Sequence, residues 1–164
     1  MRELCSAVSR ECSKYGYEPV MLTDQLCCQA KEAGSFLASI AKTHCKSGKK
    51  LAYIAGGETV VNITGHGKGG RNQEIALSAA EGIKDIANAA VFSIGSDGTD
   101  GPTDAAGGYS DGDTAGELKN KGIDIFEVLK NNDAYNALKL TEGLIITGPT
   151  GTNVNDVSVL LISD

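Results

Sequence analysis

The sequence predicts an α/β fold, a three-layer α/β/α sandwich built on a mostly parallel or mixed sheet. Two continuous apolar runs of strand length, AAVFSI at 89–94 and VSVLLI at 157–162, are typical of strands covered on both faces. Helical and strand-like segments alternate along the chain, which indicates a layered α/β sheet. With 164 residues, 41% hydrophobic and 22% charged, the chain has the size of one soluble domain, and we expect one continuous domain over 1–164.

The first half of the chain contains two helix predictions and three strand predictions. Residues 3–14 are weakly helical, and EPVMLT at 18–23 suggests a short strand. The runs KLAYIAGGE and TVVNIT predict strands at 51–56 and 59–64. Between the predicted strands at 18–23 and 51–56, the segment QAKEAGSFLASIAKTH places five apolar residues on one helical face: Ala33, Phe36, Leu37, Ile40 and Ala41.

The second half begins with an amphipathic helix over 71–84. One stripe of this helix holds Ile75, Ala79 and Ile83, with Ala76, Leu77 and Ala80 beside it. The segment TAGE at 114–117 has the spacing of a capping box, and Gly122 suits the end of that short helix. Helices near 124–130 and 133–140 and a strand at 143–147 precede the last strand.

Charge and targeting signals narrow the class of partner. The net charge is −6 and no Lys/Arg-rich run occurs, so we expect neither nucleic acid nor an anionic membrane as partner. The first residues lack the apolar core of a signal peptide, and no apolar run approaches membrane-spanning length, so we expect a cytoplasmic protein. The five cysteines form no C-x-x-C pair, and we interpret them as reduced and mostly structural.

Four glycine-rich segments follow or interrupt the predicted strands. They are AGGET at 55–59, GHGKGGRNQE at 65–74, GSDGTDGPTDAAGG at 95–108 and TGPTGTNVND at 147–156. Ligands of open α/β sheets gather at the carboxyl ends of parallel strands. We therefore expect these loops to converge on one site.

The loop GHGKGGRNQE is the most informative of the four. Gly65, Gly67 and Gly70 fit G-x-G-x-x-G before a helix, where free backbone amides, the helix dipole, Lys68 and Arg71 would together bind an anion. Arg71 would grip phosphate or carboxylate in bidentate fashion. A flexible turn whose arginine reaches only solvent is the alternative. A dinucleotide site would also need an acidic residue roughly 20 positions later, and none lies at that distance.

The aspartates that follow AAVFSI are candidate metal ligands. EF-hand spacing fails from either starting aspartate. Asp97, Asp100 and Asp104 remain candidates to hold magnesium, to bind hydroxyl groups or to take a proton, and turns closed by aspartate side chains are the alternative. The last loop is not a Walker loop, but Thr147, Thr150, Thr152 and Asn153 offer a cradle of amides and hydroxyls.

The four motifs GGET, GGRNQE, GSDGTDGPTDAAG and TGPTGTNVND, in this order, resemble MOFRL, the C-terminal domain of glycerate kinases also labelled hydroxypyruvate reductases. The resemblance covers about 52–162. It implies that 51–164 form the core of a MOFRL-like domain, with 1–50 as an approach segment and first helices.

The resemblance implies ATP-dependent phosphorylation of glycerate to 2-phosphoglycerate, with Mg²⁺, in a cleft between this domain and a larger N-terminal domain that is missing here. Arg71 would be the catalytic residue, and the missing half would supply a catalytic lysine. Two alternatives remain: an oxidoreductase acting on hydroxypyruvate, and a non-catalytic small-molecule-binding or assembly domain. A homo-oligomer also remains open. The other implied site residues are Gly56, Gly57, Glu58, Lys68, Gly69, Gly70, Asn72, Gln73, Glu74, Asp97, Gly98, Asp100, Asp104, Thr147, Thr150, Gly151, Thr152 and Asn153.

Overall fold

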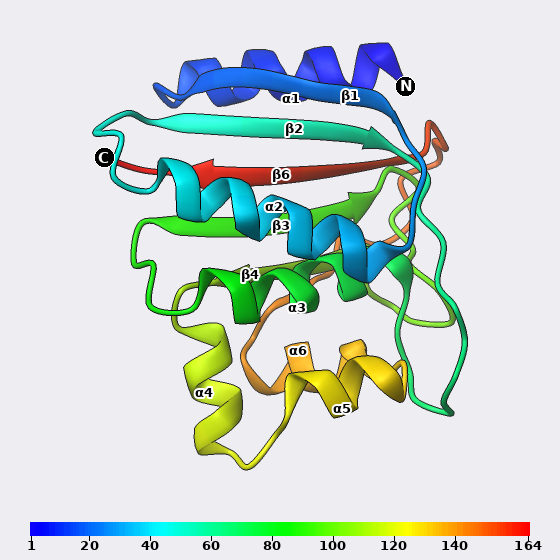
Figure 1. Ribbon diagram of the computed structural model, residues 1–164. Helices are drawn as coiled ribbons and strands as arrows, with labels where there is room; N and C mark the ends of the chain where they lie inside the picture. Colours follow the sequence, from blue (N-terminus) through cyan, green and yellow to red (C-terminus); the bar gives the residue numbers. More distant parts are fainter.

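A computed structural model describes all of residues 1–164, which form a six-stranded sheet in the order β1-β2-β6-β3-β4-β5 with six helices around it (Figure 1). The strands are β1 (Glu18–Leu26), β2 (Leu51–Gly57), β3 (Ala89–Gly95), β4 (Gly107–Asp111), β5 (Leu144–Ile145) and β6 (Asp156–Ile162). The helices are α1 (Arg2–Lys14), α2 (Ala30–His44), α3 (Arg71–Ile83), α4 (Thr114–Asn120), α5 (Ile125–Lys130) and α6 (Ala134–Leu140).

The sheet is mixed. β1 and β2 pair in parallel, whereas every other neighbouring pair is antiparallel. As a result β1, β2, β3 and β5 end at the same edge of the sheet, where β4 and β6 begin. In the β3–β6 ladder, Gly95 lies opposite Asp156, so the end of one predicted apolar run meets the beginning of the other.

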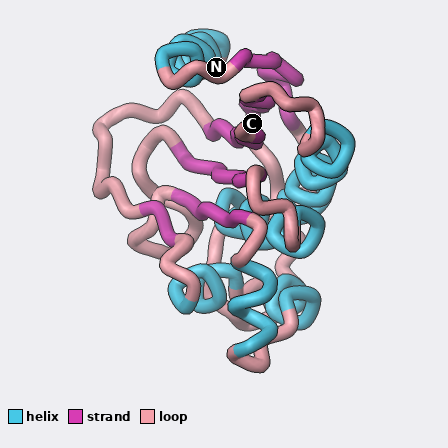
Figure 2. Tube along the Cα trace, turned by 90° about the vertical axis from the view of Figure 1, so that its left-hand side faces the viewer, coloured by secondary structure: helices cyan, strands magenta, loops and turns pink.

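Helices cover both faces of the sheet, which confirms the predicted sandwich. α2 and α3 lie on one face and α1 on the other, as the views in Figures 1 and 2 show. The first face holds the largest core cluster, with Leu37, Ile75 and Leu160 among its members. The second face holds a smaller cluster around Cys5 and Ile54. Because α1 alone covers that face, β3 is buried at alternate residues only, and its second face is less covered than the apolar run predicts.

α3 is buried almost all round. Ile75, Ala79 and Ile83 join the cluster shared with α2 and the sheet. The adjacent stripe of Ala76, Leu77 and Ala80 packs instead against α4, α5 and α6. The helix therefore packs against α2 and the sheet on one side and against α4, α5 and α6 on the other.

Two expectations for the first half are wrong. No strand forms at 59–64, where only Val60 makes an isolated parallel bridge with Gln29. β2 ends at Gly57, whose φ of 155° turns the chain out of the sheet, and residues 58–70 run as a long loop. Phe36 was predicted on the buried face of its helix but is 58% exposed.

Two expectations for the second half also differ. β4 was not predicted, because its sequence GGYSD reads as part of the aspartate loop. Its glycines serve close packing, since a Cβ on Gly107 would meet the Ser93 carbonyl and one on Gly108 would meet Leu138. The capping box at 114–117 does not form, because the Asp111 carboxylate accepts from the Thr114 backbone N–H and the Thr114 hydroxyl.

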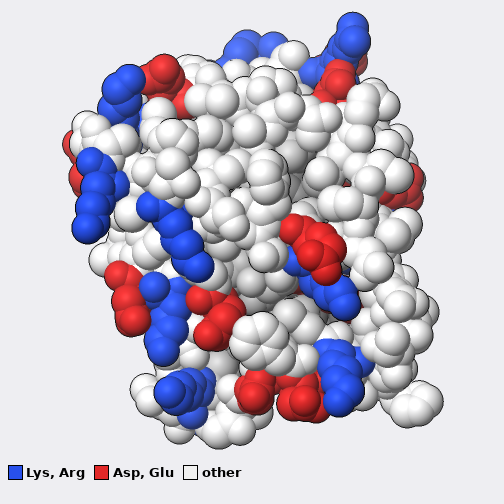
Figure 3. Space-filling model, in the orientation of Figure 1, with Lys and Arg blue, Asp and Glu red and all other residues white.

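The surface carries mixed charge. Acidic and basic side chains are interspersed over the face in Figure 3, with lysines most frequent toward the left, near the end of α2. All five cysteines are free thiols, and Cys5 is buried. None of the helices combines the length and apolar character needed to cross a membrane.

Candidate functional site

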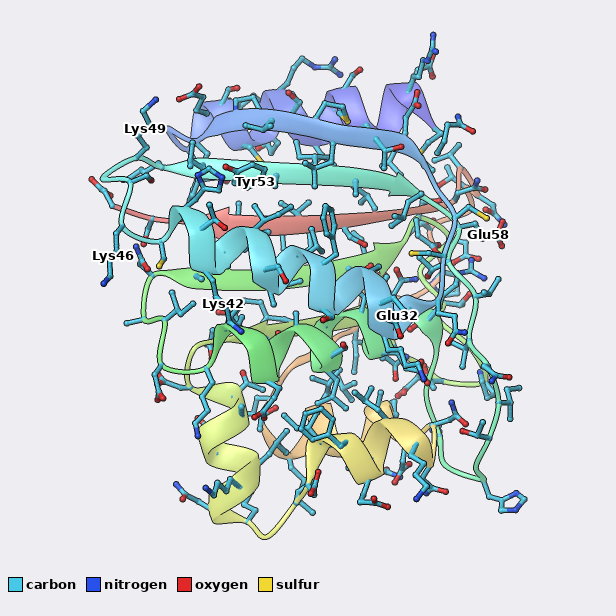
Figure 4. The ribbon with its side chains drawn as sticks, viewed as in Figure 1. Glu32, Lys42, Lys46, Lys49, Tyr53 and Glu58 are labelled. Atoms are coloured by element: carbon cyan, nitrogen blue, oxygen red, sulfur yellow. The ribbon has the colours of Figure 1, made fainter.

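Three long loops converge at the edge of the sheet where β2 and β3 end and β6 begins. Glu58 follows β2 at this edge, at the opposite end of the sheet from Lys46 and Lys49 (Figure 4). The backbone of Thr150 donates to the Asp97 carbonyl at 3.1 Å, which joins the last loop to the aspartate loop. The predicted convergence of the loops is thus observed, although the sheet is not parallel.

Arg71 begins α3 and is bound by two carboxylates. Its Nε and Nη2 donate to the two oxygens of Asp156, the second at 3.2 Å, and its Nη1 lies 3.2 Å from Glu58 Oε1. The hydrogen bond to Asp156 raises the pKa of Arg71, so the guanidinium stays charged. Arg71 was expected to bind a ligand in bidentate fashion, but its Nε and Nη2 bind Asp156 instead. Asp156 was not predicted as a site residue, although it directly precedes the apolar run 157–162.

Asp100 caps α3. Its buried carboxylate accepts from the backbone N–H of Asn72 at 3.1 Å and of Gln73 at 2.9 Å. Burial raises the pKa of Asp100, and these two hydrogen bonds oppose the rise. Two of the amides expected to bind an anion at this helix end are therefore already paired with a side chain from the aspartate loop, whereas the N–H groups of Gly69, Gly70 and Arg71 make no hydrogen bond within the protein.

The other two aspartates of the loop, Asp97 and Asp104, do not take part in the helix cap. Asp97 accepts from the Thr99 N–H at 2.9 Å and closes a local turn. Asp104 accepts from the Tyr135 hydroxyl at 2.7 Å, and that hydrogen bond lowers the pKa of Asp104. Lys68 does not face Arg71, because its Nζ lies 4.0 Å from the centre of the Tyr135 ring.

Asp97, Asp100 and Asp104 each accept from a different group of the protein. No group of three or more His, Cys, Asp or Glu side chains is arranged to hold a metal ion. A metal ion coordinated by three or more such side chains of this chain is therefore not what the arrangement offers.

The glycine loop is fastened by a turn that the sequence reasoning overlooked, Asn131–Asn132–Asp133. The side chain of Asn132 accepts from the N–H groups of Thr64 and Gly65, and that of Asn131 accepts from His66. The next two amides donate to the Asn131 carbonyl and to Asp133. Five consecutive amides, from residue 64 to residue 68, are thus satisfied within the protein.

The glycines of the G-x-G-x-x-G motif are in close contact with other parts of the protein. A Cβ on Gly65 would meet the Asn131 backbone, one on Gly67 would meet Asp133, and one on Gly70 would meet the Asp100 carboxyl group. Glycine is required here by close packing of protein on protein. In a dinucleotide site, the loop would instead keep its amides free for a pyrophosphate.

The residues after Arg71 point into the protein. Asn72 Oδ1 accepts from the Ser93 hydroxyl, which also lies 2.8 Å from the Ser158 hydroxyl. Gln73 Nε2 donates to the Asp100 carbonyl at 3.1 Å. Glu74 accepts from Asn132 Nδ2 at 2.9 Å, and burial raises its pKa. Asn72, Gln73 and Glu74 thus fix the loops around Arg71.

The threonine hydroxyls of the last loop, residues 147–156, donate hydrogen bonds to nearby backbone carbonyls. Thr150 and Thr152 both donate to the Ser96 carbonyl, and Thr147 donates to the carbonyl of Gly148. The Asn153 side chain accepts from the Asn155 N–H at 3.3 Å. The predicted cradle therefore closes on the aspartate loop. Gly98 and Gly151 supply left-handed turns, with φ of 84° and 74°.

The two glycines of AGGET also have structural contacts. A Cβ on Gly56 would meet Cys5 and Met1, because α1 packs there on the second face of the sheet, and one on Gly57 would meet the Leu26 backbone. Neither residue lines the groove described next.

A groove of about 490 Å³ opens beside Arg71. The segment 58–63 forms one wall, 100–102 another, and Glu74 and Asn132 also line it. The predicted site residues that line this groove are Glu58, Gly69, Gly70, Arg71, Glu74 and Asp100, together with Gly65 and Gly67 of the G-x-G-x-x-G motif. The lining residues that were not predicted are Thr59, Val60, Val61, Ile63, Gly101, Pro102 and Asn132.

These features define an α/β domain with an arginine–carboxylate site at a groove on the edge of its sheet. The sequence profile of the MOFRL family matches residues 51–156, and the chain belongs to this family.

Several relatives are named as glycerate kinases and two as putative hydroxypyruvate reductases, and the chain corresponds to a part of each. It is 50% identical to D-glycerate 2-kinase of Thermotoga maritima over 99% of the chain and 40% of that protein. It is 46% identical to glycerate 2-kinase of Pyrococcus horikoshii over 97% of the chain and 37% of that protein. The crystal structure of a Thermotoga maritima glycerate kinase superposes with a TM-score of 0.94 at 50% identity, over 98% of the chain and 40% of the kinase. The chain therefore spans less than half the length of these proteins.

Proposed function

We propose that the chain forms one wall of an interdomain site in which ATP phosphorylates glycerate to 2-phosphoglycerate. Arg71 carries this proposal, because it is the one cation that lines the groove, and the likeness to glycerate 2-kinases names the reaction. Phosphoryl transfer depends mainly on positioning and on neutralising charge at the phosphoryl oxygens, and a guanidinium supplies both.

The surroundings of Arg71 suit a positioning role for the neighbouring carboxylates. Asp156 accepts from Nε and from one Nη2 hydrogen, and Glu58 forms an ion pair with Nη1. A guanidinium has five N–H donors, so donors on both Nη atoms remain for a substrate oxygen. The bidentate contact with Asp156 fixes the plane of the guanidinium.

ATP would supply the phosphoryl group, and the remainder of a longer kinase would supply the second wall. The chain itself offers no cluster for a metal ion. Any Mg²⁺ bound with the nucleotide would therefore take its ligands mainly from phosphates and from the other wall.

The oxidoreductase alternative is weakened by the glycine loop. Its amides at 64–68 and those of Asn72 and Gln73 are occupied by protein groups, so only the N–H groups of Gly69, Gly70 and Arg71 remain free at this helix start. The non-catalytic alternative is weakened by the paired but partly exposed Arg71, whose side chain is 36% exposed beside the groove.

A chimera tests the proposal. Residues 1–164 would replace the matching part of the Thermotoga maritima glycerate kinase, since the two superpose closely. We expect the chimera to form ADP and 2-phosphoglycerate from ATP and glycerate, and to leave nicotinamide cofactors unchanged. A folded chimera that turns over a nicotinamide cofactor with hydroxypyruvate but forms no ADP would contradict the proposal.

A further inference from the structure

The groove beside Arg71 has an unfavourable charge for phosphate. Three carboxylates line it, those of Glu58, Glu74 and Asp100, and the single lining cation is Arg71. Asp156 and Glu58 already pair with that cation. Like charges at short range repel, most strongly where water is excluded. A triphosphate or the carboxylate of glycerate placed beside Glu74 and Asp100, away from Arg71, would therefore be repelled.

The walls of the same groove favour an uncharged ring. Val60, Val61 and Ile63 line one side and Pro102 lies on the segment that forms the other. Val60 is 57% and Ile63 79% exposed, so both side chains present apolar surface at the groove. The volume of about 490 Å³ falls within the range of small-molecule pockets.

Polar groups in the groove complement a nucleoside. Thr59 lines it with a buried hydroxyl that has no hydrogen-bond partner, although buried polar groups are normally paired. The backbone N–H of Gly69 also makes no hydrogen bond within the protein. Carboxylates accept readily from ribose hydroxyls, and Glu58 is 57% exposed at the groove.

We propose that this groove receives the uncharged nucleoside part of the nucleotide, with the purine ring against Val60 and Ile63 and the phosphates directed outward past Arg71. The proposal rests on the kinase function proposed above, because that function supplies the nucleotide. It divides the groove: the nucleoside lies between its apolar walls, and the phosphates and glycerate lie at its mouth beside Arg71.

The test is a nitrogen-15 NMR titration of the chain 1–164 with three probes: adenosine, glycerate and tripolyphosphate. Millimolar adenosine should shift the amide signals of Val60, Ile63 and Gly69, whereas the two anions should leave these signals in place. Ile63→Ser should weaken adenosine binding about tenfold, because it removes apolar contact. The matched control Leu140→Ser changes an exposed apolar residue outside the groove and should have no effect.

Three results would overturn the proposal: no shift with adenosine, larger shifts of the same signals with tripolyphosphate or glycerate, or unchanged adenosine affinity in Ile63→Ser. The kinase chimera separates this failure from failure of the proposed function. ADP formation without adenosine binding to the groove refutes the nucleoside site alone, and adenosine binding without ADP formation refutes the kinase function alone.

Discussion

Asp100 is predicted to be the residue of the aspartate loop on which the fold depends most. Its carboxylate holds the first turn of α3, and therefore Arg71, through the N–H groups of Asn72 and Gln73. Asp100→Ala leaves both buried amides without an acceptor. Each unsatisfied amide costs about 1–3 kcal/mol, and loss of a helix N-cap alone costs about 1 kcal/mol.

A partial compensation reduces this sum. Burial raises the pKa of Asp100, so the charged carboxylate is itself unfavourable in the folded state, and the substitution removes that cost. We therefore expect Asp100→Ala to lower the free energy of unfolding by about 2–4 kcal/mol. Asp100→Asn keeps one oxygen acceptor but leaves one of the two amides facing its NH2 group, so it should cost about 1–3 kcal/mol.

Urea unfolding followed by circular dichroism measures these differences. Asp97→Ala is the matched control, because Asp97 lies in the same loop and closes only a local turn, and it should cost less than about 1 kcal/mol. A loss in Asp100→Ala no larger than that in Asp97→Ala would refute the capping role.

Further predictions concern the supports of the groove. Gly70→Ala should destabilise the fold much as Asp100→Ala does, since the new Cβ would meet the Asp100 carboxyl group; equal urea midpoints for Gly70→Ala and wild type would contradict this. Asn132→Ala should speed hydrogen exchange at the amides of Thr64 and Gly65, measured by NMR, while exchange in the sheet stays slow. Burial raises the pKa of Glu74, so the folded state takes up its proton first as pH falls; the stability of wild type relative to Glu74→Gln should rise as pH drops through that raised value and be lost above it. The chain alone should show no glycerate kinase turnover in a coupled ADP assay, because one wall neither excludes water nor orients both substrates.

Much of the fold could be predicted from local pattern. The apolar runs at 89–94 and 157–162 and the helix at 71–84 have clear periodicity, and the structure places β3, β6 and α3 there. β4 could not be found this way, because Gly107 and Gly108 are selected by the close approach of neighbouring strands and helices, which leaves no apolar signal. The false strand at 59–64 has the opposite cause. Val60 and Ile63 are apolar but line a groove.

The site could be predicted only in part. A helix start with an arginine after glycines was visible, and so was the convergence of loops at one edge. The partners of Arg71 were not, because Asp156 lies 85 residues away along the chain and meets Arg71 only where the start of α3 packs against the start of β6. The same holds for Asn132, whose contacts with Thr64 and Gly65 span 68 and 67 residues. Five of the amides predicted to be free at the glycine loop, those of residues 64–68, are paired by such distant residues.

The most direct measurement of the central claim is the turnover number of the kinase chimera with Arg71 replaced. Arg71→Ala should reduce kcat about a hundredfold or more, since a charge-stabilising donor is lost in the transition state, while the chimera stays folded at the assay temperature. Arg71→Lys should restore only part of the rate, because lysine lacks the planar fork that Asp156 holds. Unchanged kcat in a folded Arg71→Ala chimera would contradict the account.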